Sequence, residues 1–144
     1  MIYIGIDCGE HTGIAVWDST RKKFLRVATV PLYLAMEIVK AYQEEYSTEA
    51  EPLAVIFEDA RKRTWFARER NASEYRGKLM GAGSVKRDAK IWEEFLDGYG
   101  IPHQAVAPRK GMTKWDAEYF AKVTGWKGRT SEHARDAALL VFQR

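Results

Sequence analysis

The first thirty residues place the strongest constraint on the fold of this chain. Three short apolar stretches, 2–7, 14–17 and 24–30, follow one another and are separated only by a glycine-bracketed turn and a polar turn. Each stretch is rich in β-branched residues or alternates between apolar and polar side chains, as strands do. Because such short turns cannot return a chain parallel to itself, these stretches predict three consecutive antiparallel strands.

The rest of the chain alternates between helical and strand patterns. Residues 32–46 carry apolar side chains at helical spacing, whereas 53–57 is continuously apolar, as in a strand buried on both faces. A largely helical stretch over 71–98 follows, with a glycine-rich interruption at 77–83. After it the pattern predicts a strand over 101–107 and a helix from Thr113 to about residue 124. The last predicted helix covers 132–143, and Thr130 or Ser131 can cap it.

This order of elements predicts an α/β fold with a mixed five-stranded sheet. Three antiparallel strands come first, two parallel strands follow, and helices cover both faces. The order is that of the ribonuclease H-like fold, although order alone leaves several other folds open. A chain of 144 residues has the length of one domain, so we expect a single domain over residues 1–144.

Acidic side chains follow two of the predicted strands at the point where each strand ends. Asp7 ends the first strand, which should lie centrally in the sheet, and Glu58 ends the next parallel strand. Sites of open α/β sheets form outside these carboxyl ends, so the two carboxylates should lie close together. Like charges at short range repel unless a cation lies between them, and carboxylates are ligands suited to Mg²⁺ or Mn²⁺.

The last predicted helix offers further ligands. His133 and Asp136 are three residues apart and therefore share a helix face, beside small and apolar residues that can pack closely on the sheet. Glu132 is four residues before Asp136 and is a rival ligand. His133 and Asp136 also have a purely structural interpretation. An acid such as Asp136 is favoured in the first turns of a helix, and a lone histidine can simply be hydrogen-bonded.

Positive charge is concentrated in one segment of the chain. Residues 61–90 contain ten Lys and Arg against three acids, a net charge of +7, whereas the whole chain carries +3. Trp65, Phe66 and Tyr75 lie within the same segment. Cations interleaved with aromatic rings are typical of a surface that binds phosphates and stacks on bases, but a solvated helix face with buried aromatic residues has the same composition.

Three features exclude other classes of protein. No apolar run approaches the roughly 20 residues of a membrane-spanning helix, and residues 1–6 lack the charged start of a secretion signal. The single cysteine, Cys8, allows no internal disulfide and suits a reducing compartment. We therefore expect a cytoplasmic protein without a membrane partner.

Three motifs together resemble those of the RuvC-like Holliday junction resolvases, and most closely their small phage and prophage relatives. They are Ile4-Gly5-Ile6-Asp7-Cys8-Gly9 with Gly13-Ile14-Ala15-Val16, Val55-Ile56-Phe57-Glu58-Asp59-Ala60-Arg61, and Glu132-His133-Ala134-Arg135-Asp136-Ala137-Ala138. With the order of elements, these motifs span nearly the whole chain. The first motif alone is weakly specific, but the combination is fairly specific.

The resemblance implies that Asp7, Glu58, His133 and Asp136 hold two Mg²⁺ ions, with Mn²⁺ as a substitute. Many family members have Asp where this chain has His133, although some relatives use His. Asp59 is the second choice for the Glu58 position, because strand alternation should point these two side chains in opposite directions. The resemblance also implies a lysine near the scissile phosphate. That role fits Lys114 best and Lys110 less securely, and a solvent-exposed lysine is an equal alternative.

The resemblance further implies a bacterial enzyme, of phage or prophage type, that cuts four-way DNA junctions as a homodimer, since two symmetric cuts match a two-fold dimer. The family has an aromatic residue that follows the second acid closely and stacks at the junction, whereas the aromatic residues come later here. The residues expected to contact DNA are Arg61, Lys62, Arg63, Trp65, Phe66, Arg68, Lys78, Lys86, Arg87, Lys110 and Lys114.

The expected chemistry is hydrolysis of a phosphodiester with two metal ions, one activating water and one neutralising the leaving 3′-oxygen. Alternatives remain open. The same fold and acids would serve a nuclease of RNA/DNA hybrids, or a branched-DNA-binding module without catalysis. The first motif also resembles that of ATPases of the actin and hexokinase class, but these need two such domains, for which 144 residues are too few.

Overall fold

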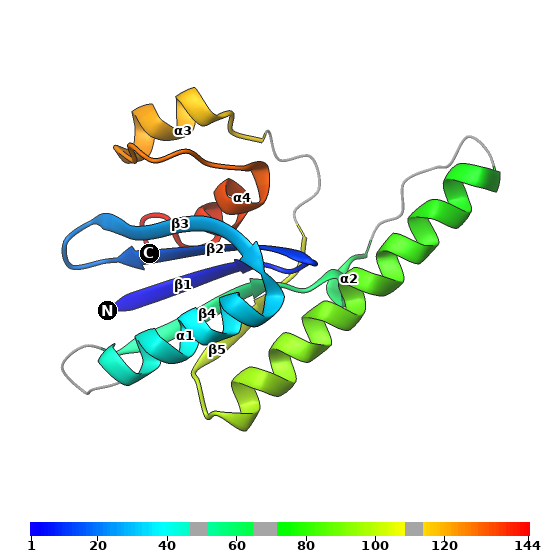
Figure 1. The fold of residues 1–144 in the computed structure, drawn as a ribbon, viewed down its shortest axis with the longest axis horizontal. Coiled ribbons are helices and arrows are strands. Elements are labelled where there is room, and N and C mark those ends of the chain that lie inside the picture. Colours follow the sequence, from blue (N-terminus) through cyan, green and yellow to red (C-terminus); the bar gives the residue numbers. More distant parts are fainter. Residues whose placement is uncertain (47–51, 65–71, 109–113) are drawn as a thin grey trace.

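The computed structural model describes residues 1–46, 52–64, 72–108 and 114–144 (Figure 1). Within these residues, five strands form one sheet: β1 (Ile2–Asp7), β2 (His11–Asp18), β3 (Lys23–Pro31), β4 (Leu53–Glu58) and β5 (His103–Val106). Their order across the sheet is β3-β2-β1-β4-β5, so β1 is central. Neighbouring strands are antiparallel from β1 to β3, whereas β1 pairs parallel with β4 and β4 with β5. The predicted mixed five-stranded sheet is confirmed.

Strand β2 is longer than the sequence pattern predicted. It begins at His11 rather than at residue 14, because the backbone of residues 11–13 also pairs with β3. Thr12 is fully buried, and its Oγ1 donates to the carbonyl oxygen of Gly9 at 2.8 Å. The polar residues assigned to a turn therefore belong partly to the strand, and this hydrogen bond closes the shorter turn that remains.

Helices cover both faces of the sheet, as predicted (Figure 1). The described helices are α1 (Leu32–Tyr46) and α2 (Ala72–Gly98) on one face, α3 (Ala117–Thr124) and α4 (Glu132–Val141) on the other, and the short 3₁₀-helix η1 (Ala60–Lys62) after β4. None of these helices is long and apolar enough to cross a membrane. The sheet therefore separates two apolar cores, one beneath each pair of α-helices.

Helix α2 is continuous, so the glycine-rich interruption predicted at 77–83 is wrong. Its C-terminal half is anchored by Trp92 and Leu96, which are fully buried against the sheet. Its N-terminal half projects away from the sheet (Figure 1), and the three glycines there have open space at the Cβ position. Each glycine costs about 1 kcal/mol relative to alanine, and that cost weakens the helix without bending it.

The two C-terminal helices begin at capped residues. The helix predicted from Thr113 begins later, at Ala117, because Asp116 caps it by accepting a hydrogen bond from the backbone N–H of Tyr119 at 2.7 Å. Thr113 itself lies outside the described residues. Ser131, one of the two predicted caps, accepts from the backbone N–H of Ala134 at 3.1 Å and starts α4.

Helix α4 lies directly on β1 and β2 at two glycines. A Cβ atom at Gly5 would collide with the carbonyl oxygen of Ala137, and one at Gly13 would collide with the carbonyl oxygen of His133. The helix buries three alanines and Val141 at this contact. Small side chains on both partners therefore bring the helix backbone down onto the sheet. The small residues beside His133 and Asp136 had predicted this close packing.

This contact predicts that Gly5→Ala destabilises the protein. The added methyl group would overpack the sheet–helix contact, and we expect a loss of about 3 kcal/mol in the free energy of unfolding, measured by urea denaturation in EDTA. The matched control is Gly77→Ala on the open surface of α2, which should instead stabilise the protein by up to about 1 kcal/mol. Equal stability of Gly5→Ala and the native chain would contradict the close contact.

Candidate functional site

Two carboxylates end neighbouring parallel strands on the α4 face of the sheet. Ile6 lies opposite Phe57 in the β1–β4 ladder, so Asp7 and Glu58 are the next residues on each strand. Ile6 and Phe57 belong to the core beneath α1 and α2. Because side chains alternate along a strand, Asp7 and Glu58 lie on the opposite face, toward α4.

The close packing of α4 brings His133 to the end of β1. Gly13 pairs with Asp7 across the β1–β2 ladder, and the backbone of His133 lies on Gly13. Nδ1 of His133 is 2.8 Å from Oδ2 of Asp7, a hydrogen bond between residues 126 positions apart. When Asp7 is ionised its carboxylate only accepts, and Nδ1 then carries the proton in this contact.

Asp136 lies one helical turn after His133 and contacts Lys114. Nζ of Lys114 is 3.3 Å from Oδ2 of Asp136 and also donates to Oε1 of Glu132. The ammonium group thus bridges two carboxylates of α4 from the segment that leads into α3. The structure brings Lys114 to the acids, while its contact with a phosphate stays a prediction.

Burial and mutual repulsion disfavour charge on the two strand-end carboxylates. Burial raises the pKa of Glu58, and the charges of Asp7 and Asp136 raise it further. Burial also raises the pKa of Asp7, although the hydrogen bond and charge of His133 act in the opposite direction. Three acids therefore share one electrostatic neighbourhood, in which an added positive charge would be favourable.

Asp59 belongs to a different set of contacts from Glu58, in line with the alternation along the strand. Its side chain is 2% exposed and accepts hydrogen bonds from both the backbone and the guanidinium group of Arg61. Burial alone would raise the pKa of Asp59, but these hydrogen bonds hold it below its usual value. The second-choice ligand is thus paired with Arg61, and the rival Glu132 shares Lys114 with Asp136.

The predicted DNA-contacting residues fall into three groups besides Lys114. Trp65, Phe66, Arg68 and Lys110 lie outside the described residues. Lys78 is exposed on the projecting half of α2, and Lys86 and Arg87 are exposed near the middle of the helix. The third group, Arg61, Lys62 and Arg63, lies in and just after η1.

Two members of the third group have structural partners that the sequence did not reveal. Nζ of Lys62 donates to the carbonyl oxygen of Ala105 on β5 at 2.8 Å. The guanidinium group of Arg61 contacts Glu93 of α2 at 2.9 Å as well as Asp59. Because 32 residues separate Arg61 from Glu93, no local pattern signals this pair.

The donor set fits a divalent cation in its chemistry. Three carboxylates and one imidazole from β1, β4 and α4 are hard or borderline ligands of the kind that Mg²⁺ and Mn²⁺ accept. Across residues 1–46, 52–64, 72–108 and 114–144, no three acidic, histidine or cysteine side chains are gathered into a ready-made metal site. Asp7 is instead hydrogen-bonded to His133, and Asp136 is paired with Lys114.

Comparisons with known proteins support the fold. No family model and no curated protein sequence matches the chain. A structure of T. thermophilus RuvC in complex with a Holliday junction substrate matches with a TM-score of 0.52 and 20% identity, over 99% of this chain and 91% of RuvC. A second Thermus thermophilus RuvC structure matches with a TM-score of 0.50 and 20% identity, over 99% and 92%. The chain therefore has the RuvC-like form of the ribonuclease H-like fold.

The raised pKa of Glu58 predicts that its charge destabilises the metal-free protein. A carboxyl group whose folded pKa is raised contributes stability at low pH that is lost as the pH rises through that pKa. We therefore expect Glu58→Gln to raise Tm in EDTA at pH 7 by roughly a few degrees. This gain should disappear near pH 4, because the pKa of glutamate is about 4.3 in unfolded chains and the side chain is then largely protonated.

Tm is measured by differential scanning calorimetry. The control is Glu45→Gln, which changes an exposed acid at the end of α1 and should leave Tm unchanged. Addition of Mg²⁺ should then stabilise the native chain more than Glu58→Gln. A lower Tm for Glu58→Gln than for the native chain at pH 7 in EDTA would show that the Glu58 charge is not repelled.

Proposed function

We propose that this protein is a divalent-metal-dependent endonuclease that cuts branched DNA, with the four-way junction as its preferred substrate. The observation that carries the proposal is the neighbouring position of Asp7, Glu58, His133 and Asp136 at the carboxyl ends of β1 and β4. The RuvC-like fold adds support, because one of the matching structures is RuvC in complex with a Holliday junction substrate. The motifs of the sequence indicate the same class of enzyme.

The four residues are proposed to hold two Mg²⁺ ions, with Mn²⁺ as a substitute. Bound ions would activate a water and neutralise the leaving 3′-oxygen in a phosphodiester hydrolysis. The chain positions the ligands for this task. The sheet holds Asp7 and Glu58 at the ends of two paired strands, and the hydrogen bond from Nδ1 to Asp7 orients the ring of His133.

Lys114 is proposed to bind the scissile phosphate. Its hydrogen bond with Glu132, with help from Asp136, raises the pKa of Lys114, so the ammonium group stays charged at neutral pH. Glu132 can retain this group beside the site when Asp136 serves as a ligand. A cation held there can stabilise negative charge that develops on a phosphate oxygen.

The exposed basic side chains of α2 are proposed to bind the phosphates of the DNA arms. Lys78 lies on the projecting half, Lys86 and Arg87 lie near the middle of the helix, and all three are exposed. Phosphate contacts supply most of the sequence-independent affinity for DNA. The proposal includes a homodimer, because a four-way junction requires two symmetric cuts. It also includes a bacterial cytoplasmic setting and a phage or prophage origin, which rest on the motif resemblance.

The proposal predicts metal-dependent, paired nicks in a four-way junction. End-labelled junction, linear duplex, flap DNA and RNA/DNA hybrid are incubated with Mg²⁺, Mn²⁺ or EDTA. Asp7→Asn should reduce junction cleavage by at least about 100-fold, because several kcal/mol of transition-state charge stabilisation depend on the metal. Asp97→Asn, which changes an exposed acid on α2 (69% exposed), should cleave like the native chain.

The other substrates separate the alternatives. Cleavage of the hybrid alone would keep the metal site and reassign the enzyme to RNA removal. Tight junction binding without cleavage of any substrate would leave a DNA-binding module, and the enzyme proposal would be wrong.

The surface assignment predicts the salt dependence of junction binding in EDTA. Lys86→Ala and Arg87→Ala should each weaken binding and reduce the slope of log K against log salt by about 1, since each change removes one phosphate contact. Lys23→Ala alters an exposed lysine at the far end of the sheet, where β3 begins, and should leave the slope unchanged. Unaltered slopes for both α2 variants would contradict this surface.

A further inference from the structure

We infer that Arg61 is a positioning residue, which links the end of β4, and therefore Glu58, to helix α2. Its place in the basic segment had predicted a contact with DNA instead. The inference rests on the proposed function, in which Glu58 is a metal ligand. Three sets of contacts carry it, and they involve the chain after Glu58, the buried carboxylate of Asp59 and the side chain of Glu93.

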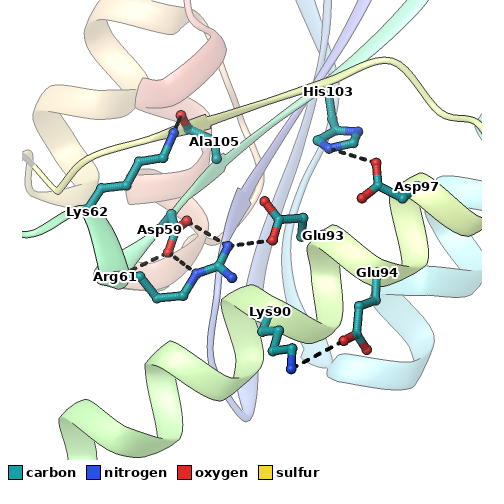
Figure 2. Close-up of polar contacts among 9 residues, drawn as sticks. All are labelled: Asp59, Arg61, Lys62, Lys90, Glu93, Glu94, Asp97, His103 and Ala105. Carbon is teal, nitrogen blue, oxygen red and sulfur yellow. Dashed lines mark hydrogen bonds and ion pairs between the residues drawn. The ribbon is translucent and has the colours of Figure 1, made fainter.

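The guanidinium group of Arg61 lies between two carboxylates (Figure 2). Its Nε is 2.8 Å from Oδ1 of Asp59, and its Nη2 is 2.8 Å from Oδ2 of the same residue. Nη2 is also 2.9 Å from Oε2 of Glu93 on α2. A two-pronged contact of this kind fixes geometry as well as charge, and lysine cannot reproduce it.

Asp59 anchors this network to the sheet. Its backbone N–H donates to the carbonyl oxygen of Val106 on β5 at 2.8 Å, and its Oδ1 accepts from the backbone N–H of Arg61 at 2.9 Å. A carboxylate that is only 2% exposed needs a charged partner. Arg61 supplies that charge, so the turn after β4 depends on it.

Glu58 directly precedes this anchored residue. The negative charges of Asp7 and Asp136 act on its carboxylate and repel it. Repulsion favours conformations in which Glu58 moves away from the other acids unless its backbone is held. The Asp59–Arg61 contacts hold it, and a metal ligand must be kept within about 0.5 Å of its productive position.

Glu93 extends the network to the opposite face of the sheet. It follows Trp92, whose fully buried side chain seats this part of α2. The same helix carries Lys86 and Arg87, the proposed DNA surface, about two turns earlier. The Arg61–Glu93 contact therefore joins the helix proposed to bind DNA to the strand end that supplies a metal ligand.

The charge balance around Arg61 argues against a direct phosphate contact. Two carboxylates already face its guanidinium group, and both raise the pKa of Arg61 above its usual value. A phosphate would have to compete with them for the same donors.

The test compares Glu93→Ala with Glu94→Ala, two changes of the same chemistry on adjacent residues. Glu94 pairs only with Lys90 in Figure 2, across an exposed contact of 3.6 Å, and forms no link to Arg61 there. Hydrogen exchange in EDTA should show faster exchange at the backbone amides of Asp59, Arg61 and Lys62 in Glu93→Ala, by about 10-fold, and no change in Glu94→Ala. Arg61→Lys should have the same effect as Glu93→Ala.

Two binding measurements complete the test. Mn²⁺ affinity of the DNA-free protein, followed by electron paramagnetic resonance, should fall about 10-fold in Glu93→Ala, the lower end for residues that support metal ligands. Junction affinity in EDTA and its salt slope should stay unchanged in Arg61→Gln. A slope reduced by about 1 in Arg61→Gln would overturn the inference, because Arg61 would then be a phosphate contact.

The readouts separate the two proposals. Unchanged exchange in Glu93→Ala, with normal Mn²⁺ binding and cleavage by the native chain, would overturn the positioning role and leave the proposed function intact. Suppose instead that exchange is faster in Glu93→Ala but the native chain binds no Mn²⁺ and cuts no DNA. The contact between Arg61 and α2 would then be supported, and the proposed metal-dependent function would be wrong.

Discussion

The close approach of α4 to the sheet is the contact on which the candidate site depends. Gly5 and Gly13 leave no side chain between β1, β2 and the helix backbone, and the alanines of α4 complete the fit. A larger residue at either glycine would lift the helix by the thickness of a side chain. His133 would then lose its hydrogen bond to Asp7, since such bonds weaken steeply with distance.

Burial and charge repulsion within the site oppose the packing that brings its carboxylates together. Burial and repulsion raise the pKa of Glu58 and of Asp7, which means that the folded chain holds these groups at a cost to its own stability. His133 and Lys114 offset part of this cost through hydrogen bonds and charge. Groups that lower stability yet are held together at strand ends are characteristic of functional sites.

The site is supported from both faces of the sheet. On one face, α4 carries His133 and Asp136. On the other face, α2 reaches the end of β4 through Glu93, Arg61 and Asp59 (Figure 2). This arrangement gives the long α2 a structural role besides its exposed basic surface. It also explains why Arg61, a basic residue of the charged segment, pairs with a buried acid.

Local patterns in the sequence were enough to determine the elements and the ends of the strands that matter. Alternation and apolar runs identified the five strands, and the same alternation separated Glu58 from Asp59, because successive side chains of a strand must lie on opposite faces. The three-residue spacing of His133 and Asp136 likewise follows from helix geometry alone. Only the tertiary structure decided the continuity of α2 through its glycines, the tie between Arg61 and Glu93, and the bridge from Lys114 to Glu132 and Asp136. These features join residues far apart in the chain, and their partners are set by how helices pack on the sheet, which no local pattern encodes.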